Sequence, residues 1–81
     1  MTLYEFRALD SLEQAEAVWN GMYLDDRIEG DLTVVLYQID AFYVEVFYHQ
    51  DMNRVIRYRP FATTDLLTPY LNKIDLHSLF N

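Results

Sequence analysis

Two consecutive segments of strand-forming residues constrain the fold of this chain more than any other feature. Residues 32–39, LTVVLYQI, and residues 42–49, FYVEVFYH, are rich in β-branched and aromatic side chains. Only Asp40 and Ala41 separate them, which is the length of a tight hairpin turn. Asp-Ala is a weaker turn signal than Asn-Gly, so the predicted register depends on matching the faces of the two strands.

The two-residue turn predicts which residues of the hairpin lie opposite one another and share a face of the sheet. One face, the core face, is almost wholly apolar and contains the pairs Ile39 with Phe42, Tyr37 with Val44, Val35 with Val46, and Thr33 with Tyr48. The opposite face, the outer face, contains the pairs Gln38 with Tyr43, Leu36 with Glu45, Val34 with Phe47, and Leu32 with His49. This second mixture is too apolar for an ordinary hydrated surface.

Residues 54–60, RVIRYRP, predict a further strand that holds three of the six basic residues of the chain. Its register on the preceding strand starts with His49 opposite either Arg54 or Val55. The first choice would set Arg57 against the core face, so the second is predicted. It gives the pairs Tyr48 with Ile56, Phe47 with Arg57, Val46 with Tyr58, and Glu45 with Arg59. The strand's outward arginines then meet an aromatic ring and a carboxylate.

Turn residues delimit the rest of the predicted sheet. The register of the last strand leaves residues 51–53 as a three-residue loop, in which Asn53 suits a left-handed backbone. Pro60 ends the hydrogen bonding of that strand. Ahead of the hairpin, a short edge strand is predicted around residues 22–28, turning at EGD, and its charges discourage pairing with other chains.

Residues 10–20 predict a helix ahead of the sheet, with Asp10 as its cap and Glu13 completing a capping box. One stripe of this helix, expected to pack on the sheet, consists of Leu12, Ala15, Trp19 and Met22. Trp19 is predicted to be a core anchor rather than an exposed binding residue. Residues 3–9, LYEFRAL, predict a short extended piece, and whether it adds a strand to the sheet stays open.

A second helix is predicted after the sheet, with Thr64 as its cap and apolar residues at helical spacing: Leu66, Leu67, Tyr70, Leu71 and Ile74. Pro69 interrupts this pattern, so the alternative is a helix that starts with Thr68 as its cap and Pro69 in its first turn. The tail carries Leu79 and Phe80, which would dock on the sheet or on another chain.

Together these elements predict a single α+β domain over residues 1–81. We expect a four-stranded antiparallel β-meander with an N-terminal and a C-terminal helix, both packed on the core face. At this length one domain with one modest core is the most that the chain can form. A composition that is 52% hydrophobic, with two glycines and two prolines, is typical of an ordered chain.

Composition also argues against several classes of function. The chain has no cysteine, so it forms no disulfide or thiolate metal site. A net charge of −7 argues against direct binding to nucleic acid or anionic lipid. No apolar run reaches the roughly 18 residues that cross a bilayer. The first residues lack the basic start and apolar run of a signal peptide, so a cytoplasmic protein is expected.

No motif predicts a catalytic, metal or cofactor site. The two histidines, His49 and His77, lack metal-ligand spacing. The acidic segment from Asp25 has calcium-loop spacing, but Arg27 and Leu36 occupy positions that need ligands. The sequence contains no phosphate-binding loop and no nucleophile turn. A small meander with helices is expected to leave too little volume for a substrate pocket. We therefore expect no enzymatic activity and no small-molecule substrate.

The outer face of the sheet is the predicted functional surface. Six residues define it: Gln38, Tyr43, Glu45, Phe47, Arg57 and Arg59. Tyrosine, phenylalanine and arginine are the types enriched at the centres of protein interfaces. The sequence thus predicts a non-catalytic interaction module that joins another protein or a second copy of itself through this face. The alternative is that the second helix or the tail covers this face within the monomer.

A second functional hypothesis is a small acidic inhibitor or immunity-type protein that presents carboxylates to a basic target. Residues 1–31 contain two arginines and eight acidic residues, which are Glu5, Asp10, Glu13, Glu16, Asp25, Asp26, Glu29 and Asp31. The alternative is that these charges form a solvated face that keeps the protein soluble.

Four segments carry a resemblance: VWNGMYLDDR, LYQIDAFYVEVFY, NRVIRYRPF and LLTPYLNKIDL. They resemble a group of short, uncharacterised bacterial proteins that share a Trp-x-Gly segment, a hairpin of this pattern and a Pro-Tyr-Leu helix. Where that group often has Asp, this chain has Asn20. The resemblance covers most of the chain and implies no activity.

Overall fold

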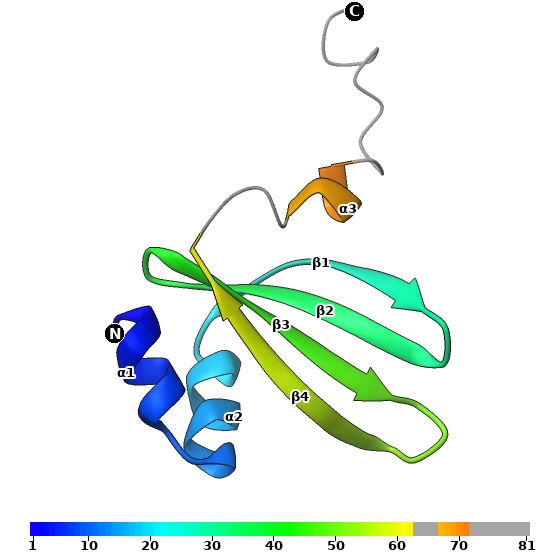
Figure 1. Ribbon diagram of the computed structural model, residues 1–81, viewed down its shortest axis with the longest axis horizontal. Coiled ribbons are helices and arrows are strands. Elements are labelled where there is room, and N and C mark those ends of the chain that lie inside the picture. Colours follow the sequence, from blue (N-terminus) through cyan, green and yellow to red (C-terminus); the bar gives the residue numbers. More distant parts are fainter. Residues whose placement is uncertain (63–66, 72–81) are drawn as a thin grey trace, which may run out of the picture.

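The computed structural model describes residues 1–62 and 67–71 and has an α+β fold (Figure 1). Four antiparallel strands follow one another in the sheet, in the order β1 (Met22–Glu29), β2 (Leu32–Ile39), β3 (Phe42–His49) and β4 (Arg54–Phe61). Two helices precede the sheet, α1 (Leu3–Ala8) and α2 (Ser11–Trp19), and within the described residues α3 (Thr68–Leu71) follows it. The predicted meander and the predicted edge strand are confirmed.

The central hairpin has the predicted register. All the pairs from Leu32 opposite His49 to Ile39 opposite Phe42 occur as face matching predicts. Asp40, the first turn residue, has a φ of 51°, a conformation that aspartate tolerates better than most side chains. Strong apolar alternation therefore fixes the register even though the turn sequence is a weak signal.

The register of β4 is confirmed over part of the strand and wrong at its start. Three predicted pairs are present, namely Glu45 with Arg59, Val46 with Tyr58, and Phe47 with Arg57. Between Phe47 and Tyr48 the register shifts, so that Tyr48 lies opposite Val55 and His49 opposite Arg54. A β-bulge absorbs the extra residue, which keeps the later arginines on the outer face. The loop is therefore one residue longer than predicted, and Asn53 has the expected positive φ of 53°.

The extended piece predicted for residues 3–9 is wrong, because this segment forms α1. Its cap is a capping box. The Glu5 backbone N–H donates to the Thr2 hydroxyl, and the Thr2 backbone N–H donates to the Glu5 carboxylate. Phe6 is fully buried and its ring lies 5.9 Å from that of Phe42. A helix so short is unstable alone, so the burial of Phe6 holds α1 in place.

Helix α2 begins with the predicted capping box of Asp10 and Glu13, but the stripe predicted to pack on the sheet is wrong in phase. Val18 is the buried residue, whereas Trp19 is 83% exposed and Leu12 is 70% exposed. The prediction of Trp19 as a core anchor is therefore wrong. Phe6 of α1 and Val18 of α2 fill the core together. Helix α2 therefore turns the side that carries Val18 towards the core, and not the stripe that carries Trp19.

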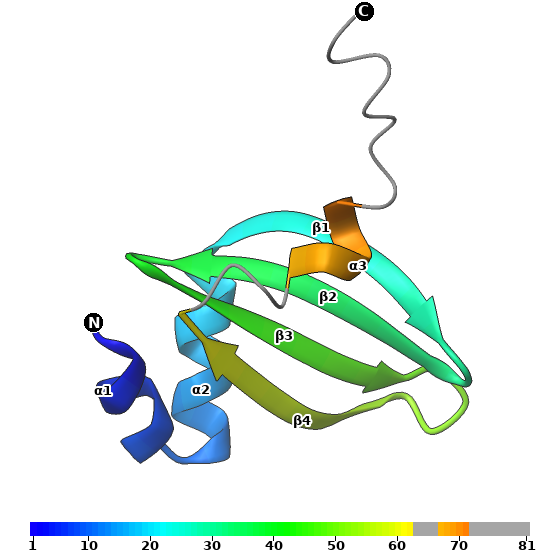
Figure 2. The same cartoon turned by 45° about the horizontal axis from the view of Figure 1, so that its top comes forward.

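The prediction that both terminal helices share the core face is also wrong. Figure 2 shows α1 and α2 on one side of the sheet and α3 on the other. The core face contains the larger apolar cluster: Phe6, Val18, Ile39, Phe42, Val44 and Val46. The outer face contains a second cluster: Leu36, Phe61 and Tyr70. Pro69 lies in the first turn of α3, as the alternative start predicts, and the rest of the predicted second helix and tail lies outside the described residues.

Candidate functional site

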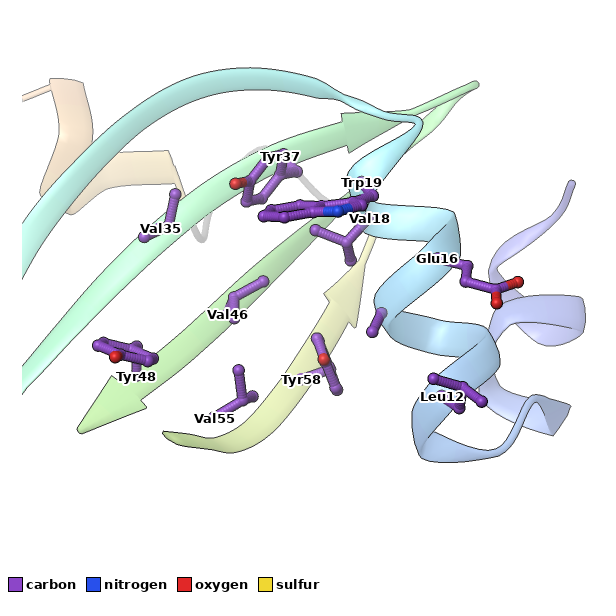
Figure 3. Close-up of a pocket in the computed structure, with 11 residues that line it drawn as sticks. Leu12, Glu16, Val18, Trp19, Val35, Tyr37, Val46, Tyr48, Val55 and Tyr58 are labelled. Carbon is purple, nitrogen blue, oxygen red and sulfur yellow. The ribbon is translucent and has the colours of Figure 1, made fainter. Parts of the chain in front are cut away.

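An apolar groove of about 440 Å³ lies on the core face between α2 and the part of the sheet that α2 leaves uncovered (Figure 3). We call it the core-face groove. Its wall is made by residues of α2, which are Leu12, Ala15, Glu16, Val18 and Trp19. Its floor is made by residues of β2, β3 and β4, which are Val35, Tyr37, Val46, Tyr48, Val55 and Tyr58.

Simple periodicities place these side chains. Alternate residues of a strand share a face, so the core-face positions of three adjacent strands form one apolar floor. On α2, Leu12, Ala15 and Trp19 follow the spacing of one helical stripe. The predicted stripe therefore exists, but it borders the groove instead of filling the core. Figure 3 shows the Trp19 ring extending from α2 over the sheet beside Tyr37.

The groove has little polar chemistry. Among the described residues that line it, Glu16 is the one that carries a formal charge. The Tyr48 hydroxyl is hydrogen-bonded to Asn53 Oδ1, and burial raises the pKa of the Tyr58 hydroxyl, which keeps it protonated. Such a lining suits apolar and aromatic groups, with tyrosine hydroxyls available for orientation.

At one side of the groove lies the edge strand β4, whose first half is exposed. Val55 is 40% exposed and Ile56 is 44% exposed, and Arg54 and Arg57 are exposed beside them. The Arg57 guanidinium carbon lies 4.3 Å from the centroid of the Phe47 ring. This contact is the predicted meeting of an arginine with an aromatic ring, and it confirms the pairing on the outer face.

The outer face holds a buried charge cluster around Glu45, which is fully buried. Its Oε1 accepts hydrogen bonds from the Arg59 guanidinium, from Nε at 2.7 Å and also from Nη2. Its Oε2 accepts from the Tyr70 hydroxyl at 2.7 Å and from Arg27 Nη2 at 3.1 Å. Arg27 also pairs with Glu29. The predicted contact of Arg59 with Glu45 is confirmed, within a larger network that brings α3 onto the sheet.

The network changes the proton affinity of its members. Burial alone would raise the pKa of Glu45, but the hydrogen bonds from Tyr70, Arg59 and Arg27 outweigh it and hold that pKa below its usual value of 4.5. Burial, and then the hydrogen bond to the Glu45 carboxylate, raise the pKa of Tyr70. At neutral pH the cluster therefore contains a carboxylate, a neutral phenol and two guanidinium groups.

The lowered pKa of Glu45 predicts how stability depends on pH. Because the folded-state pKa lies below the unfolded value near 4.5, the stabilisation is complete above that value and is lost as pH falls through the folded-state pKa. We expect the difference in free energy of unfolding between wild type and Glu45→Gln to stay constant above about pH 6 and to shrink below pH 4.5. Urea unfolding from pH 7 to 2.5 measures it. A constant difference throughout would contradict the assignment.

The structure places the six predicted surface residues in different environments. Glu45 and Phe47 are buried within the chain, Arg57 is exposed, and the other three are half-buried: Gln38, Tyr43 and Arg59. The Tyr43 ring stacks on Phe61 at 5.5 Å, and Gln38 donates to the backbone carbonyl of Asp40. Around Glu45 the structure follows the alternative interpretation, in which the second helix covers this face, because Tyr70 of α3 bonds to that carboxylate.

Sequence reasoning missed the core-face groove, and the prediction of too little volume for a pocket is wrong. A signal was present, because α2 has nine residues and each of the four strands has eight. A helix rises less per residue than a strand, so α2 is too short to cover the whole face of the sheet.

The structure places His49 in a local contact, in which its Nδ1 accepts a hydrogen bond from the Met52 backbone N–H at 3.2 Å. Among residues 1–62 and 67–71 there is no group of three metal-ligating side chains and no helix of membrane-spanning length and apolarity.

Comparison of the chain with family models, with curated proteins and with solved structures gives no match. The resemblance to short bacterial proteins stays a prediction. The functional argument therefore depends on the geometry of this chain alone.

Proposed function

We propose that this protein is a non-catalytic interaction module that binds another protein through the core-face groove. One observation carries the proposal: an apolar groove of about 440 Å³ is bordered by a tryptophan that is 83% exposed. Tryptophan is among the residues that dominate binding energy at interfaces, and an exposed one beside an apolar pocket is a typical anchor. Burying such surface is the main favourable term in association.

The geometry moves the proposed contact from the outer face to the core face. The predicted outer surface has Glu45 and Phe47 at its centre, and both side chains are already buried within the chain. The Glu45 carboxylate already accepts hydrogen bonds from Arg59 and Tyr70, and the Phe47 ring already contacts Arg57. Among the residues that the structure describes, the core-face groove presents apolar side chains that are not covered in this way, with Leu12 and Trp19 on its wall.

Trp19→Ala is expected to weaken binding of the partner at least about tenfold, because an exposed tryptophan anchor is removed. Stability is expected to change by less than about 0.5 kcal/mol, because Trp19 contributes little to the core. The partner is found by capture from extracts of the cells that make the protein. It is then purified, and its dissociation constant is measured for wild type and variant.

The matched control is Ile28→Ala, which removes an apolar side chain that is 70% exposed on β1 and does not line the groove. A protein held by wild type and Ile28→Ala but released by Trp19→Ala supports the proposal. Equal binding to all three proteins, or no protein lost selectively with Trp19→Ala, overturns it.

The acidic-inhibitor hypothesis stays a prediction, because several of its carboxylates have local structural roles. Glu5, Asp10 and Glu13 form the two capping boxes. Asp26 is hydrogen-bonded to the Tyr23 hydroxyl, and Glu29 pairs with an arginine. These contacts give no specific support to a surface that imitates phosphates.

A further inference from the structure

The two edges of the sheet differ in the sign of the charges that they carry. At the β1 edge the register shifts between Tyr23 and Asp25, and two adjacent carboxylates follow. The Asp26 backbone N–H donates to the Asp25 carboxylate at 2.8 Å. A bulge and charges are the usual protection of an edge strand. The first half of β4, the last described strand in the sheet order, also has a bulge, opposite Phe47 and Tyr48, but its charges are arginines and it exposes Val55 and Ile56.

The two faces of the β4 edge have different chemistry. On the core face, Val55 and Tyr58 line the groove. On the outer face, the partners of Arg54 and Arg57 in β3 are His49 and Phe47, which are two residues apart and share a face. The bulge therefore sets two arginines, three apart in sequence, at the spacing of alternate strand residues. A strand added at this edge would meet apolar groups on one face and positive charge on the other.

We propose that the first half of β4 receives an extended segment of another protein as a fifth strand. This inference rests on the proposed function, because the groove takes the apolar side chains of that segment. The segment alternates apolar residues, which enter the groove beside Val55, with carboxylates, which lie beside Arg54 and Arg57. Backbone hydrogen bonds supply affinity and the alternating side chains supply specificity, as in other cases of strand addition.

Charge complementarity selects this partner over a second copy. Antiparallel pairing of two β4 edges would bring the arginines of both copies together, and like charges across a strand pair are destabilising. Pairing β4 with the β1 of a second copy would not close into a symmetric dimer. A local basic edge on an acidic chain therefore fits a separate acidic strand.

The probe is a blocked eight-residue peptide that alternates Glu and Val, carrying a fluorescent label for anisotropy. The comparison peptides are one with the same composition in separate Glu and Val blocks and one that alternates Lys and Val. Trp19 is the single tryptophan and borders the groove, so its emission gives a second readout of occupancy. Hydrogen exchange of the β4 amides in the wild-type protein gives a third.

We expect the alternating Glu peptide to bind better than the block peptide, to protect β4 amides, and to bind less tightly as salt rises. Arg54→Glu and Arg57→Glu are each expected to weaken it about tenfold, by turning attraction into repulsion. The double variant is expected to prefer the Lys peptide. The matched control, Arg7→Glu, makes the same charge change on α1, off the sheet, and is expected to leave binding within about twofold.

Three results overturn the inference. If the alternating and block peptides bind equally, the protein does not recognise an alternating segment. If the β4 variants do not change binding, the peptide does not bind at the β4 edge. Concentration-dependent association of the wild-type protein that the β4 variants abolish identifies a second copy as the occupant. If the β4 variants bind normally but Trp19→Ala does not, strand addition fails while the proposed function of the groove survives. Arg54→Glu and wild-type hydrogen exchange keep the test decisive if Arg57→Glu unfolds.

Discussion

Glu45→Ala is expected to lower the free energy of unfolding by about 3 to 5 kcal/mol, a large part of the stability of a domain of this size. The carboxylate is fully buried and holds Arg59, Arg27 and Tyr70 together. Without it, Arg59 loses its counter-charge, Arg27 keeps only Glu29, and the phenol loses its acceptor. Because Arg59 is 37% exposed and can regain water, we expect a value toward the lower end. Urea or thermal unfolding gives the measurement.

Glu29→Ala is the control for this prediction. It removes another partner of Arg27, with the same change in charge, but the Glu29 side chain is 56% exposed. An exposed ion pair contributes about 0 to 1 kcal/mol, so a small effect is expected. If the two variants lose equal stability, the network is not a buried one and the account of the outer face is wrong. The difference in stability between these two variants also bears on function, because Glu45 connects α3 to the face of the sheet opposite the groove.

The parts of the fold that could be predicted are those set by neighbouring residues in a regular pattern. Face matching gave the β2–β3 register, because one slip would expose every core residue of the hairpin. It failed at the start of β4, because alternation assumes an unbroken pleat and the bulge near Tyr48 breaks it. Arg57 and Arg59 were placed correctly because they lie beyond the bulge on the side where the register holds.

The predictions for α1 and for the packing of α2 were wrong for other physical reasons. The prediction of an extended piece for LYEFRAL did not use the capping box of Thr2 and Glu5, which marks a helix start. Helical spacing identified the stripe that contains Trp19, but spacing alone cannot tell how far a sheet extends beneath a helix. The groove was missed for the same reason. The outer face is too apolar for a hydrated surface because it contains Leu36 and Phe47, and the alternative of a second helix covering this face rested on that observation.

Phe6→Ala is expected to cost about 3 to 5 kcal/mol of stability, because it empties the centre of the core cluster. The Phe6 ring packs against the rings of Phe42 at 5.9 Å and Tyr58 at 6.3 Å. A six-residue helix cannot persist without its tertiary anchor, so α1 should unfold first. Amide exchange in α1 should therefore rise more than exchange in the β2–β3 hairpin, and denaturant unfolding measures the overall loss.

Tyr4→Ala provides the matched test on the same helix, because Tyr4 is 78% exposed and its removal leaves the core intact. Its effect is expected to stay within about 0.5 kcal/mol. Phe6→Ala should also weaken binding at the groove through Tyr58, which lines the groove and contacts Phe6. If Phe6→Ala is as stable as Tyr4→Ala, the first residues do not pack as α1, and the extended piece predicted for residues 3–9 would be the better description of them.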